Sequence, residues 1–355
     1  MYRIAVIPGD GIGPEVVEQG LRVLESASRQ FGFEVSLHRY PFGADHYLAT
    51  GELLPDQNLQ EVRNLDAVYL GAIGDPRVER GVLERGIIGR LRWDLDMYVN
   101  LRPIRLYSEL VCPLKGKQPR DVDMVVVREN TEDAYLGMGG FFKKGTPDEV
   151  ATCECIYTRR GTERVIRYAF ELARTRPRKH LTLVDKANAV VAHDLWRRTF
   201  EEVARDFPDV TTATAYVDAC AMWMIKNPEW LDVVVTTNMF GDILTDLGAM
   251  IQGGLGLAAS ANLHPGQVSL FEPIHGSAPR YAGQGKANPL AAILAVSMML
   301  DYLGEKKAAQ SIEGAVEKLF AEGILTDLST SSGRSTGEYG ELVLGKMNET
   351  ASVGG

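Results

Sequence analysis

The sequence predicts an α/β protein in which largely parallel sheets are covered by helices on both faces. Two observations support this class. Short apolar runs alternate with segments of helical length, which is the rhythm of repeated βαβ units. The runs are rich in Val, Ile and Leu and alternate little, as expected for strands that are buried on both faces.

The predicted elements follow one another along the whole chain. The first strand covers Tyr2–Ile7, and Pro14 then suits the first turn of a helix that we expect to run to about Arg29. The further predicted strands are Glu34–Tyr40, Ala67–Gly71, Val122–Arg128, Leu181–Val184, Thr212–Val217 and Asp232–Thr236. The further predicted helices lie near residues 160–176, 193–206, 219–226, 240–251, 289–303 and 306–321.

Composition narrows the class of protein. The chain has 355 residues, enough for two or three domains or one large α/β unit. Hydrophobic residues make up 45% and charged residues 24%, which excludes a mainly disordered chain. With 47 acidic and 38 basic residues the net charge is -9, which argues against broad binding to nucleic acid. An anionic substrate must therefore be attracted by local positive groups.

Cysteine usage and hydropathy predict a cytoplasmic protein. The four cysteines form neither a disulfide framework nor a metal-binding spacing, so a reducing compartment is expected. The N-terminal residues lack the pattern of a signal peptide. No apolar run reaches the roughly 18 residues that span a bilayer, so we expect no membrane partner.

A glycine-rich turn, residues 9–13, connects the first strand to the first helix. This is the context of a dinucleotide fingerprint, but G-x-G-x-x-G requires glycine where the chain has Pro14. The turn also lacks the G-K-[ST] of a P-loop. Its spacing alone is typical of a tight connection between a strand and a helix.

Three aspartates are candidate metal ligands. Asp242 and Asp246 are four residues apart in a predicted helix, so their carboxylates lie on one face and repel each other unless a cation lies between them. Asp218 follows the strand Thr212–Val217, at the end where α/β sheets place ligands. Such oxygen ligands suit Mg²⁺ or Mn²⁺. The alternatives are two solvated surface aspartates and an ordinary helix N-cap at Asp218.

Arginines, a lysine and a tyrosine complete the candidate site. Arg128 ends an apolar run and must be paired or bind an anion, and with Arg92 and Arg102 it predicts a carboxylate-binding pocket. Lys186 follows the strand Leu181–Val184, and near a metal it could act as a base. Tyr135 could donate a proton. The alternatives are structural ion pairs for the arginines and Lys186, and simple packing for the tyrosine.

Taken together and in this order, these signals resemble one family, the β-decarboxylating dehydrogenases of isopropylmalate, isocitrate, homoisocitrate and tartrate or D-malate. The most specific blocks are Gly-Asp-Ile-Leu-x-Asp and His-Gly-Ser-Ala-Pro. The matching stretches are Pro8–Glu15, Asn100–Pro103, Arg128–Glu132, Asp185–Asn188, Asn238–Asp246, Phe271–Pro279 and Ala287–Pro289.

The resemblance implies a two-lobed fold that is not a standard Rossmann fold. One lobe, with the cofactor, would be residues 1–97 plus 254–355, and the other, with substrate, metal and dimer contacts, residues 98–253. The family forms homodimers in which each site borrows residues from the partner, and Lys186 and Asp218 match the borrowed positions. A non-catalytic regulatory relative is the alternative, but such relatives lose members of the catalytic set, and all members are present here.

The resemblance also assigns roles. Metal ligands would be Asp218, Asp242 and Asp246, and the malate carboxylates would bind Arg92, Arg102 and Arg128. Lys186 would accept the hydroxyl proton with help from Asp218, and Tyr135 would protonate the enol after loss of CO₂. The dinucleotide, NAD with NADP as an alternative, would bind Ile12, His275, Gly276, Ser277, Ala278, Pro279, Arg280 and Asn288.

Substrate and dinucleotide preference rest on two departures within the family pattern. Isocitrate enzymes that it resembles carry Ser-x-Asn where this chain has Gly86-Ile87-Ile88, so apolar Ile88, with Ile87, favours the isopropyl group of 3-isopropylmalate. D-malate and tartrate are the alternative substrates. NAD enzymes of the family usually have an acid where this chain has Arg280, which predicts that both NAD and NADP are accepted.

Overall fold

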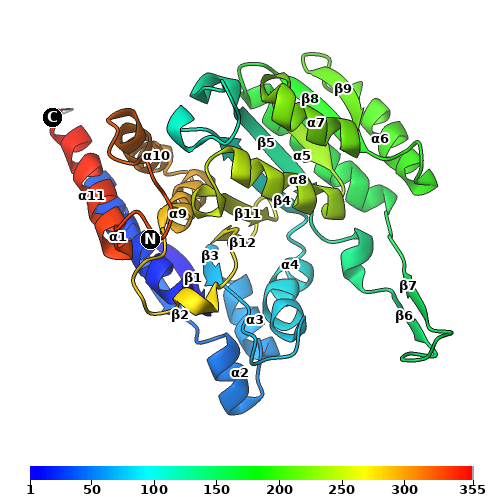
Figure 1. The fold of residues 1–355 in the computed structure, drawn as a ribbon, viewed down its shortest axis with the longest axis horizontal. Coiled ribbons are helices and arrows are strands. Elements are labelled where there is room, and N and C mark those ends of the chain that lie inside the picture. Colours follow the sequence, from blue (N-terminus) through cyan, green and yellow to red (C-terminus); the bar gives the residue numbers. More distant parts are fainter. Residues whose placement is uncertain (354–355) are drawn as a thin grey trace. The chain divides into compact units, whose positions relative to one another are not determined.

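The structure, a computed structural model, describes the backbone of residues 1–353 and the side chains of residues 1–349. The chain forms two compact units. Unit 1 comprises Met1–Met97, Arg105–Arg120 and Ala249–Gly355, and unit 2 comprises Tyr98–Ile104 and Asp121–Gly248. Each unit is an α/β structure (Figure 1).

Unit 1 differs from the expected lobe in two segments. Residues 105–120 and 249–253, expected in the second lobe, belong to unit 1. Contacts explain this difference. Arg105 forms ion pairs with Glu313 at 2.6 Å and with Glu317 at 3.1 Å. A Cβ placed on Gly253 would lie 2.9 Å from Val111, so these two segments also pack closely.

The sheet of unit 1 has the order β2-β1-β3-β12-β11. β1 pairs in parallel with β2 and β3, and β3 pairs in parallel with β12, whereas β11 and β12 are antiparallel. The strands are β1 (Tyr2–Gly9), β2 (Val35–Arg39), β3 (Ala67–Ala72), β11 (Ala259–Leu263) and β12 (Ser269–Pro273). The helices are α1 (Gly13–Phe31), α2 (Ala44–Thr50), α3 (Asp56–Arg63), α4 (Arg90–Asp94), α9 (Leu290–Tyr302), α10 (Lys306–Ala321) and α11 (Thr336–Val353).

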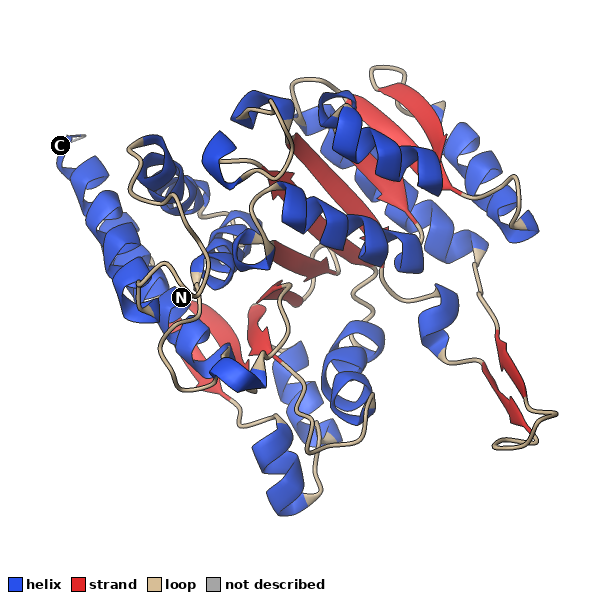
Figure 2. Cartoon of the chain, viewed as in Figure 1, coloured by secondary structure: helices blue, strands red, loops and turns tan. Residues whose placement is uncertain are grey.

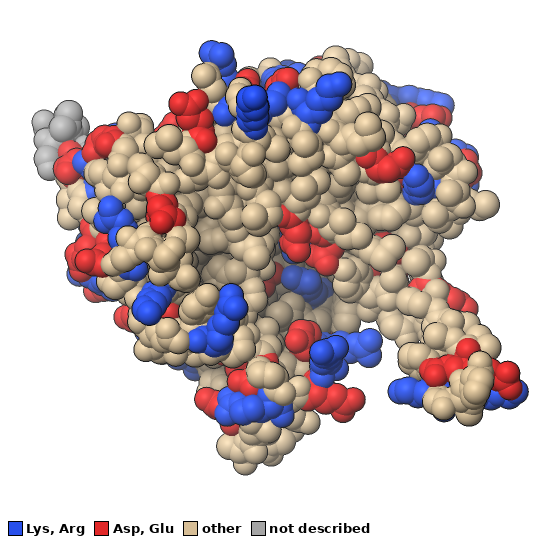
Figure 3. Space-filling model, viewed as in Figure 1, with Lys and Arg blue, Asp and Glu red and all other residues tan. Residues whose placement is uncertain are grey.

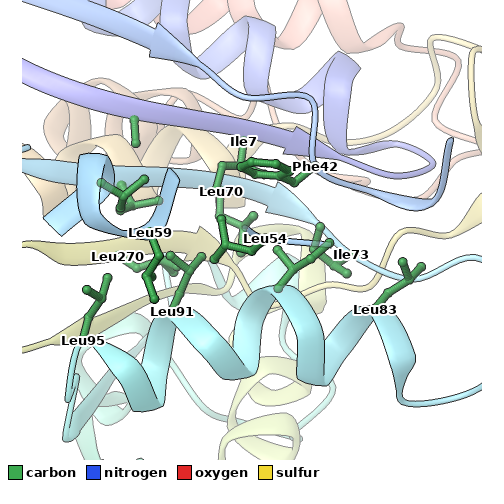
Figure 4. Packing of buried hydrophobic residues seen from close by; sticks show 14 of the residues in the cluster. Ile7, Phe42, Leu54, Leu59, Leu70, Ile73, Leu83, Leu91, Leu95 and Leu270 are labelled. Carbon is green, nitrogen blue, oxygen red and sulfur yellow. The ribbon is translucent and has the colours of Figure 1, made fainter. Parts of the chain in front are cut away.

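Alternation along the central strands divides the core of unit 1 into two layers. On β3, Leu70 points to the layer that contains α3 and α4, where it joins Leu59 and Leu91 in a buried cluster (Figure 4). The preceding side chain, Tyr69, points to the opposite layer and donates a hydrogen bond to the carbonyl of Ala292 on α9 at 2.9 Å. The sheet is therefore covered on both faces, as its apolar strands predict.

The sheet of unit 2 has the order β4-β5-β10-β8-β9, and the four strands from β5 to β9 are parallel. Figure 2 shows these strands with helices beside them. The strands are β4 (Val99–Arg105), β5 (Asp123–Glu129), β8 (His180–Asp185), β9 (Thr211–Tyr216) and β10 (Val233–Thr236). The helices are α5 (Arg159–Thr175), α6 (Asp194–Ala204), α7 (Val217–Lys226) and α8 (Asn238–Ile251).

A separate two-stranded hairpin extends from unit 2. β6 (Gly139–Phe142) and β7 (Val150–Cys153) are antiparallel, and every residue in them is exposed. Figure 3 shows charged side chains at the tip of this hairpin, where Lys143 and Asp148 form an ion pair at 3.6 Å. Its strands instead expose apolar side chains: Phe141 is 61% and Phe142 65% exposed.

The predicted mixed α/β class is confirmed, and each predicted strand and helix is present within a few residues. The sequence did not predict the short helices α2 and α3, the long C-terminal helix α11, the strands β4, β11 and β12, or the β6–β7 hairpin. No helix among the described residues is long and apolar enough to cross a membrane.

The parallel strands of unit 2 bring the candidate groups to one edge of its sheet. Arg128 lies next to the end of β5, Lys186 directly follows β8, and Asp218 lies two residues after β9. α8, with two of the aspartates, begins two residues after β10. The carboxyl ends of parallel strands meet at one edge, where α/β proteins bind ligands.

Candidate active site

Two carboxylates on α8 lie beside an arginine from β4. Asp242 Oδ1 is 3.6 Å and Asp246 Oδ1 is 3.8 Å from the nearest guanidinium nitrogen of Arg102. The two aspartates therefore share a helix face, as their spacing predicts. Burial raises the pKa of the Asp246 carboxyl, and repulsion by Asp242 acts in the same direction, whereas the Arg102 and Arg128 charges lower it.

The guanidinium of Arg102 is held by polar side chains of its own unit. Its Nε donates to Asn100 Oδ1 at 2.8 Å, and its Nη1 donates to Thr245 Oγ1 at 2.6 Å. Thr245 lies on α8 between the two aspartates. These contacts hold the buried guanidinium of Arg102 beside the carboxylates of α8.

Arg128 is almost completely buried and contacts Asp242 Oδ1, the same oxygen that Arg102 approaches. It forms an ion pair with Asp242 and donates from Nε to Asn238 Oδ1 at 2.9 Å. α8 approaches this side chain through Gly241, where a Cβ would lie 2.5 Å from Arg128 Cγ. Glycine at this position therefore allows the close packing that places the helix carboxylate on the arginine.

Tyr135 completes this group of side chains. Its hydroxyl donates to Asp242 Oδ2 at 2.7 Å, and the Arg128 guanidinium lies 5.3 Å from the centre of its ring. Burial, together with the neighbouring Asp242 carboxylate, raises the pKa of the Tyr135 hydroxyl to about 12. The hydroxyl is thus protonated at neutral pH and can act as a proton donor.

Lys186 and Asp218 form a second group in unit 2. Lys186 Nζ is 2.5 Å from Asp218 Oδ1, and this hydrogen bond lowers the pKa of the Asp218 carboxyl. Asp218 lies in the first turn of α7 and remains exposed. Among the described residues, no three His, Cys, Asp or Glu side chains are close enough to hold a metal ion, so one chain does not bring Asp218 to Asp242 and Asp246.

The donor set on α8 fits a divalent cation. Asp242 and Asp246 present carboxylate oxygens on successive turns, and hard oxygen ligands are those that Mg²⁺ and Mn²⁺ prefer. Within the described residues of one chain, α8 therefore supplies two of the three predicted carboxylates.

In unit 1, the guanidinium of Arg92 has a nitrogen that could bind an anion. Its Nη2 donates to Glu272 Oε1 at 2.9 Å, and Asn262 donates to the same oxygen at 2.7 Å. Its buried Nε finds no hydrogen-bond partner within residues 1–349. A buried donor without a partner is costly, which favours a ligand oxygen at this position.

The segment before Arg92 corrects one expectation about the substrate pocket. Residues Glu84–Gly89 form a π-helical stretch, a form that is frequent at functional sites. Ile87 is fully buried in the core of unit 1 and is not available to a ligand. Ile88 is only partly buried and lies one turn before Arg92, so it alone of the two isoleucines can border a substrate.

The glycine-rich turn packs against the loop that contains the His-Gly-Ser-Ala-Pro block. Ile12 N–H donates to the carbonyl of Ser277 at 2.8 Å. Gly11 has a φ of 58°, and a Cβ on it would overlap the Ser277 carbonyl. The glycine therefore allows close contact between the two loops.

Among the described residues of unit 1, one nitrogen of His275 and one of Asn288 are buried without a hydrogen-bond partner. His275 Nδ1 contacts the Gly276 carbonyl at 3.1 Å, whereas its Nε2 is unpartnered in the described part of the chain. Burial lowers the pKa of the His275 imidazole, which is therefore neutral. Asn288 Oδ1 accepts from Leu290 N–H at the start of α9, and its Nδ2 is likewise unpartnered among those residues. Both atoms fit a polar ligand.

A cavity of about 390 Å³ lies beside Asn288, within the size range of small-molecule sites. One wall of it is the glycine-rich segment 253–256, which follows α8. The cavity is lined by Leu110, Val111, Gly253, Gly254, Leu255, Gly256, Asn288, Thr326, Asp327, Leu328 and Ser329. Arg280 is exposed, with its guanidinium 4.6 Å from the centre of the Tyr281 ring.

Solved structures define the class of fold. An isocitrate dehydrogenase from Methylococcus capsulatus is 38% identical, with a TM-score of 0.88 over 98% of this chain and 99% of that chain. A β-decarboxylating dehydrogenase from Thermococcus kodakarensis is 35% identical, with a TM-score of 0.80 over 99% of this chain and 98% of that chain. The chain thus has the fold of these dehydrogenases.

The model of the isocitrate/isopropylmalate dehydrogenase family matches residues 3–343, and the chain belongs to this family. A 3-isopropylmalate dehydrogenase from Thermobifida fusca is 50% identical over 350 residues, which cover 98% of each chain. A 3-isopropylmalate dehydrogenase from Frankia casuarinae is 52% identical over 339 residues, or 95% of this chain and 97% of its own.

Glu129, the last residue of β5, is a buried carboxyl next to this site. Its Oε1 accepts from the N–H and hydroxyl of Thr131, both at 2.7 Å, and its Oε2 accepts from Glu132 N–H at 2.9 Å. Burial nevertheless raises its pKa to about 7. The folded protein therefore retains a proton that the unfolded chain releases at lower pH.

We expect Glu129 to make the protein less stable as the pH rises. Because its folded pKa lies above its unfolded value, its favourable contribution is complete below about pH 4.5 and is lost by about pH 7. Glu129→Gln cannot ionise, so its free energy of unfolding should decrease less over this range than that of the wild type. Urea unfolding of both proteins between these pH values measures the difference, and equal pH slopes would contradict the assignment.

Proposed function

We propose that this protein catalyses the oxidative decarboxylation of (2R,3S)-3-isopropylmalate to 4-methyl-2-oxopentanoate and CO₂, a step of leucine biosynthesis. The main support is that Arg102, Arg128 and Tyr135 converge on the α8 carboxylates in a chain about half identical to 3-isopropylmalate dehydrogenases. NAD, with NADP as an alternative, would accept the hydride.

Each group has a defined task in this reaction. The guanidinium groups of Arg92, Arg102 and Arg128 bind and orient the two carboxylates of the malate. Asp242 and Asp246, with Asp218 of a second chain, would hold a divalent cation, which would supply a positive charge that stabilises negative charge on the substrate oxygen.

Proton transfers complete the chemistry. Lys186 accepts the proton of the C2 hydroxyl, and a bound nicotinamide would accept the hydrogen on C2 as hydride. The resulting 2-oxo acid loses its β-carboxylate as CO₂, and the electron pair of the broken bond forms an enolate. Tyr135, protonated at neutral pH, delivers a proton to the enol carbon.

In unit 1, the proposed dinucleotide site lies around His275 and Asn288. The unpartnered nitrogens of these residues supply polar contacts, and the neighbouring cavity has room for a ring system. We also propose a cytoplasmic location, on the ground that the four cysteines are free.

The proposed homodimer would complete the metal site. α7 and α8 pack closely together: a Cβ on Gly248 of α8 would lie only 3.3 Å from Met224 Cε of α7. Their outer surfaces carry apolar side chains: Met222 is 69%, Ile243 61% and Met250 55% exposed. An exposed apolar surface of this kind indicates a protein interface. A second copy covering it would meet α7, which carries Asp218, and α8, which carries the other aspartates.

The substrate assignment is tested by measuring NADH formation with 3-isopropylmalate, D-malate, tartrate and isocitrate. We expect the highest kcat/KM for 3-isopropylmalate and none of this activity after metal removal with EDTA. Ile88→Asn should reduce kcat/KM for 3-isopropylmalate roughly tenfold or more, because it replaces an apolar wall by an amide. Ile88→Leu is the matched control. A higher wild-type kcat/KM for another substrate, or full activity in EDTA, would contradict the proposal.

Shared active sites predict complementation between inactive variants. Lys186→Ala and Tyr135→Phe should each be inactive alone. After joint unfolding and refolding, mixed dimers contain one site with an intact Tyr135 from one chain and an intact Lys186 from the other. Part of the activity should therefore return. Each variant refolded alone, and refolded wild type, are the controls, and no recovery while wild type recovers would argue against shared sites.

Arg280 predicts weak discrimination between NAD and NADP, because a guanidinium can bind the 2′-phosphate and does not repel NAD. Arg280→Asp should shift preference towards NAD, since a carboxylate accepts hydrogen bonds from the ribose and repels phosphate. Arg39→Asp, an exposed arginine on β2, is the control. The ratio of kcat/KM values for the two dinucleotides measures the effect. A wild-type preference for NAD above roughly a thousandfold, about 4 kcal/mol, would show that Arg280 does not face the ribose.

A further inference from the structure

Three segments of unit 2 carry the groups assigned to the reaction, and each meets the same buried line of side chains. The first is the turn Asp133–Leu136, which contains Tyr135. The second is the loop that begins at Lys186, and the third is the start of α8, which leads to Asp242. The connecting side chains are Asp133, Tyr157 and His193, none of which has a role in the chemistry described above.

Hydrogen bonds join these side chains end to end. His193 Nδ1 accepts the backbone N–H of Lys186 at 2.9 Å, and His193 Nε2 lies 3.1 Å from the Tyr157 hydroxyl. That hydroxyl donates to Asp133 Oδ1 at 2.8 Å. Asp133 Oδ2 accepts the backbone N–H of Met239, in the first turn of α8, at 2.9 Å. The line therefore runs from Lys186 to the start of the helix that carries the metal ligands.

Only one arrangement of protons satisfies every link. Because His193 Nδ1 accepts from an amide, the imidazole carries its proton on Nε2 and donates it to the Tyr157 oxygen. The Tyr157 hydroxyl then donates to Asp133, whose other oxygen accepts from α8. Burial lowers the pKa of the His193 imidazole, in keeping with this neutral form.

The surroundings leave the line little freedom. Asp133 and His193 are 0% and 1% exposed. The His193 ring lies edge-on to Tyr157, at 5.0 Å between centroids, and to Phe240 of α8, at 5.4 Å. Asp133 has a φ of 74°, a conformation that costs energy outside glycine and persists where surrounding bonds impose it. Its carboxylate supplies such bonds, two residues before Tyr135.

We propose that Tyr157 and His193 are positioning residues, which with Asp133 hold the Lys186 loop, the Tyr135 turn and the start of α8 in one fixed arrangement. Proton transfer at Lys186 and Tyr135 depends on distance, and a displacement of about 1 Å can cost roughly a hundredfold in rate. In the proposed dimer, Lys186 serves the partner's site while Tyr135 serves its own, so each line connects elements of two sites. The inference rests on the proposed function.

Tyr157→Phe is the sharpest test, because it removes the hydroxyl shared by two links and keeps the ring. We expect kcat for 3-isopropylmalate to fall roughly tenfold or more, with KM changed by less than about twofold, since the arginines are untouched. Tyr302→Phe is the matched control: it removes a hydroxyl that donates to two backbone carbonyls in unit 1, away from this line. It should leave kcat unchanged.

A double-mutant cycle separates positioning from general loss of structure. His193→Asn retains an acceptor for Lys186 N–H but cannot reach Tyr157, so its kcat should resemble that of Tyr157→Phe. Because both changes break one line, the double variant should lose little more than either single variant. Additive losses, or wild-type kcat in Tyr157→Phe, would overturn the proposal. A rise in KM at unchanged kcat would do so as well.

Amide hydrogen exchange gives a readout that does not need turnover. In Tyr157→Phe, exchange should accelerate in residues 133–139 and 186–193, and not in Tyr302→Phe. Exchange that is unchanged in both segments would overturn the proposal that this line of side chains holds them in place. If the wild type does not oxidise 3-isopropylmalate, the proposed function fails, but amide hydrogen exchange still tests whether the line of side chains holds the two segments. Should His193→Asn fail to fold, Tyr157→Phe alone decides the outcome.

Discussion

The site depends on the neutralisation of two buried arginines. Arg102 and Arg128 cannot lose their charge, so folding unit 2 requires a carboxylate beside them. Asp242 meets both, and this requirement determines where α8 lies and why glycine at position 241 faces Arg128. The other oxygen of Asp242 accepts a hydrogen bond from the Tyr135 hydroxyl. The pocket that we propose for the dicarboxylate substrate and its cation is therefore built around this ion-pair cluster.

Local sequence patterns were sufficient to predict those parts of the structure that depend on residues close together in the chain. The buried parallel strands and the i, i+4 spacing of Asp242 and Asp246 are local features, and both were predicted. The sequence did not reveal that Ile87 points into the core while Ile88 remains accessible, because this depends on a π-helical stretch that has no sequence signature. It also gave no reason to select His193 or Tyr157, since their significance arises from partners distant in sequence.

The proposed dinucleotide site illustrates the same limit. The glycine-rich turn follows a strand and opens a helix, which is the context of a Rossmann fingerprint. Only the structure shows that Gly11 gives room to the Ser277 carbonyl, more than 250 residues later in the chain. Spacing could exclude the usual motif, but the contact that replaces it is long-range. Only the family resemblance linked the turn to the block that contains His275, because local sequence patterns carry no information on this contact.

The order of strands in unit 1 has a consequence for synthesis at the ribosome. β3 pairs with β1 on one side and on the other with β12, which is made only after all of unit 2. Until then, one edge of β3 and the apolar side chains that Leu270 and Phe271 later cover remain open to other chains. Unit 2, by contrast, has all of its strands once β10 has been made. The unit that contains the N-terminus is therefore the last to close, and the nascent chain is most exposed to misassociation and to chaperones while its middle section is already folded.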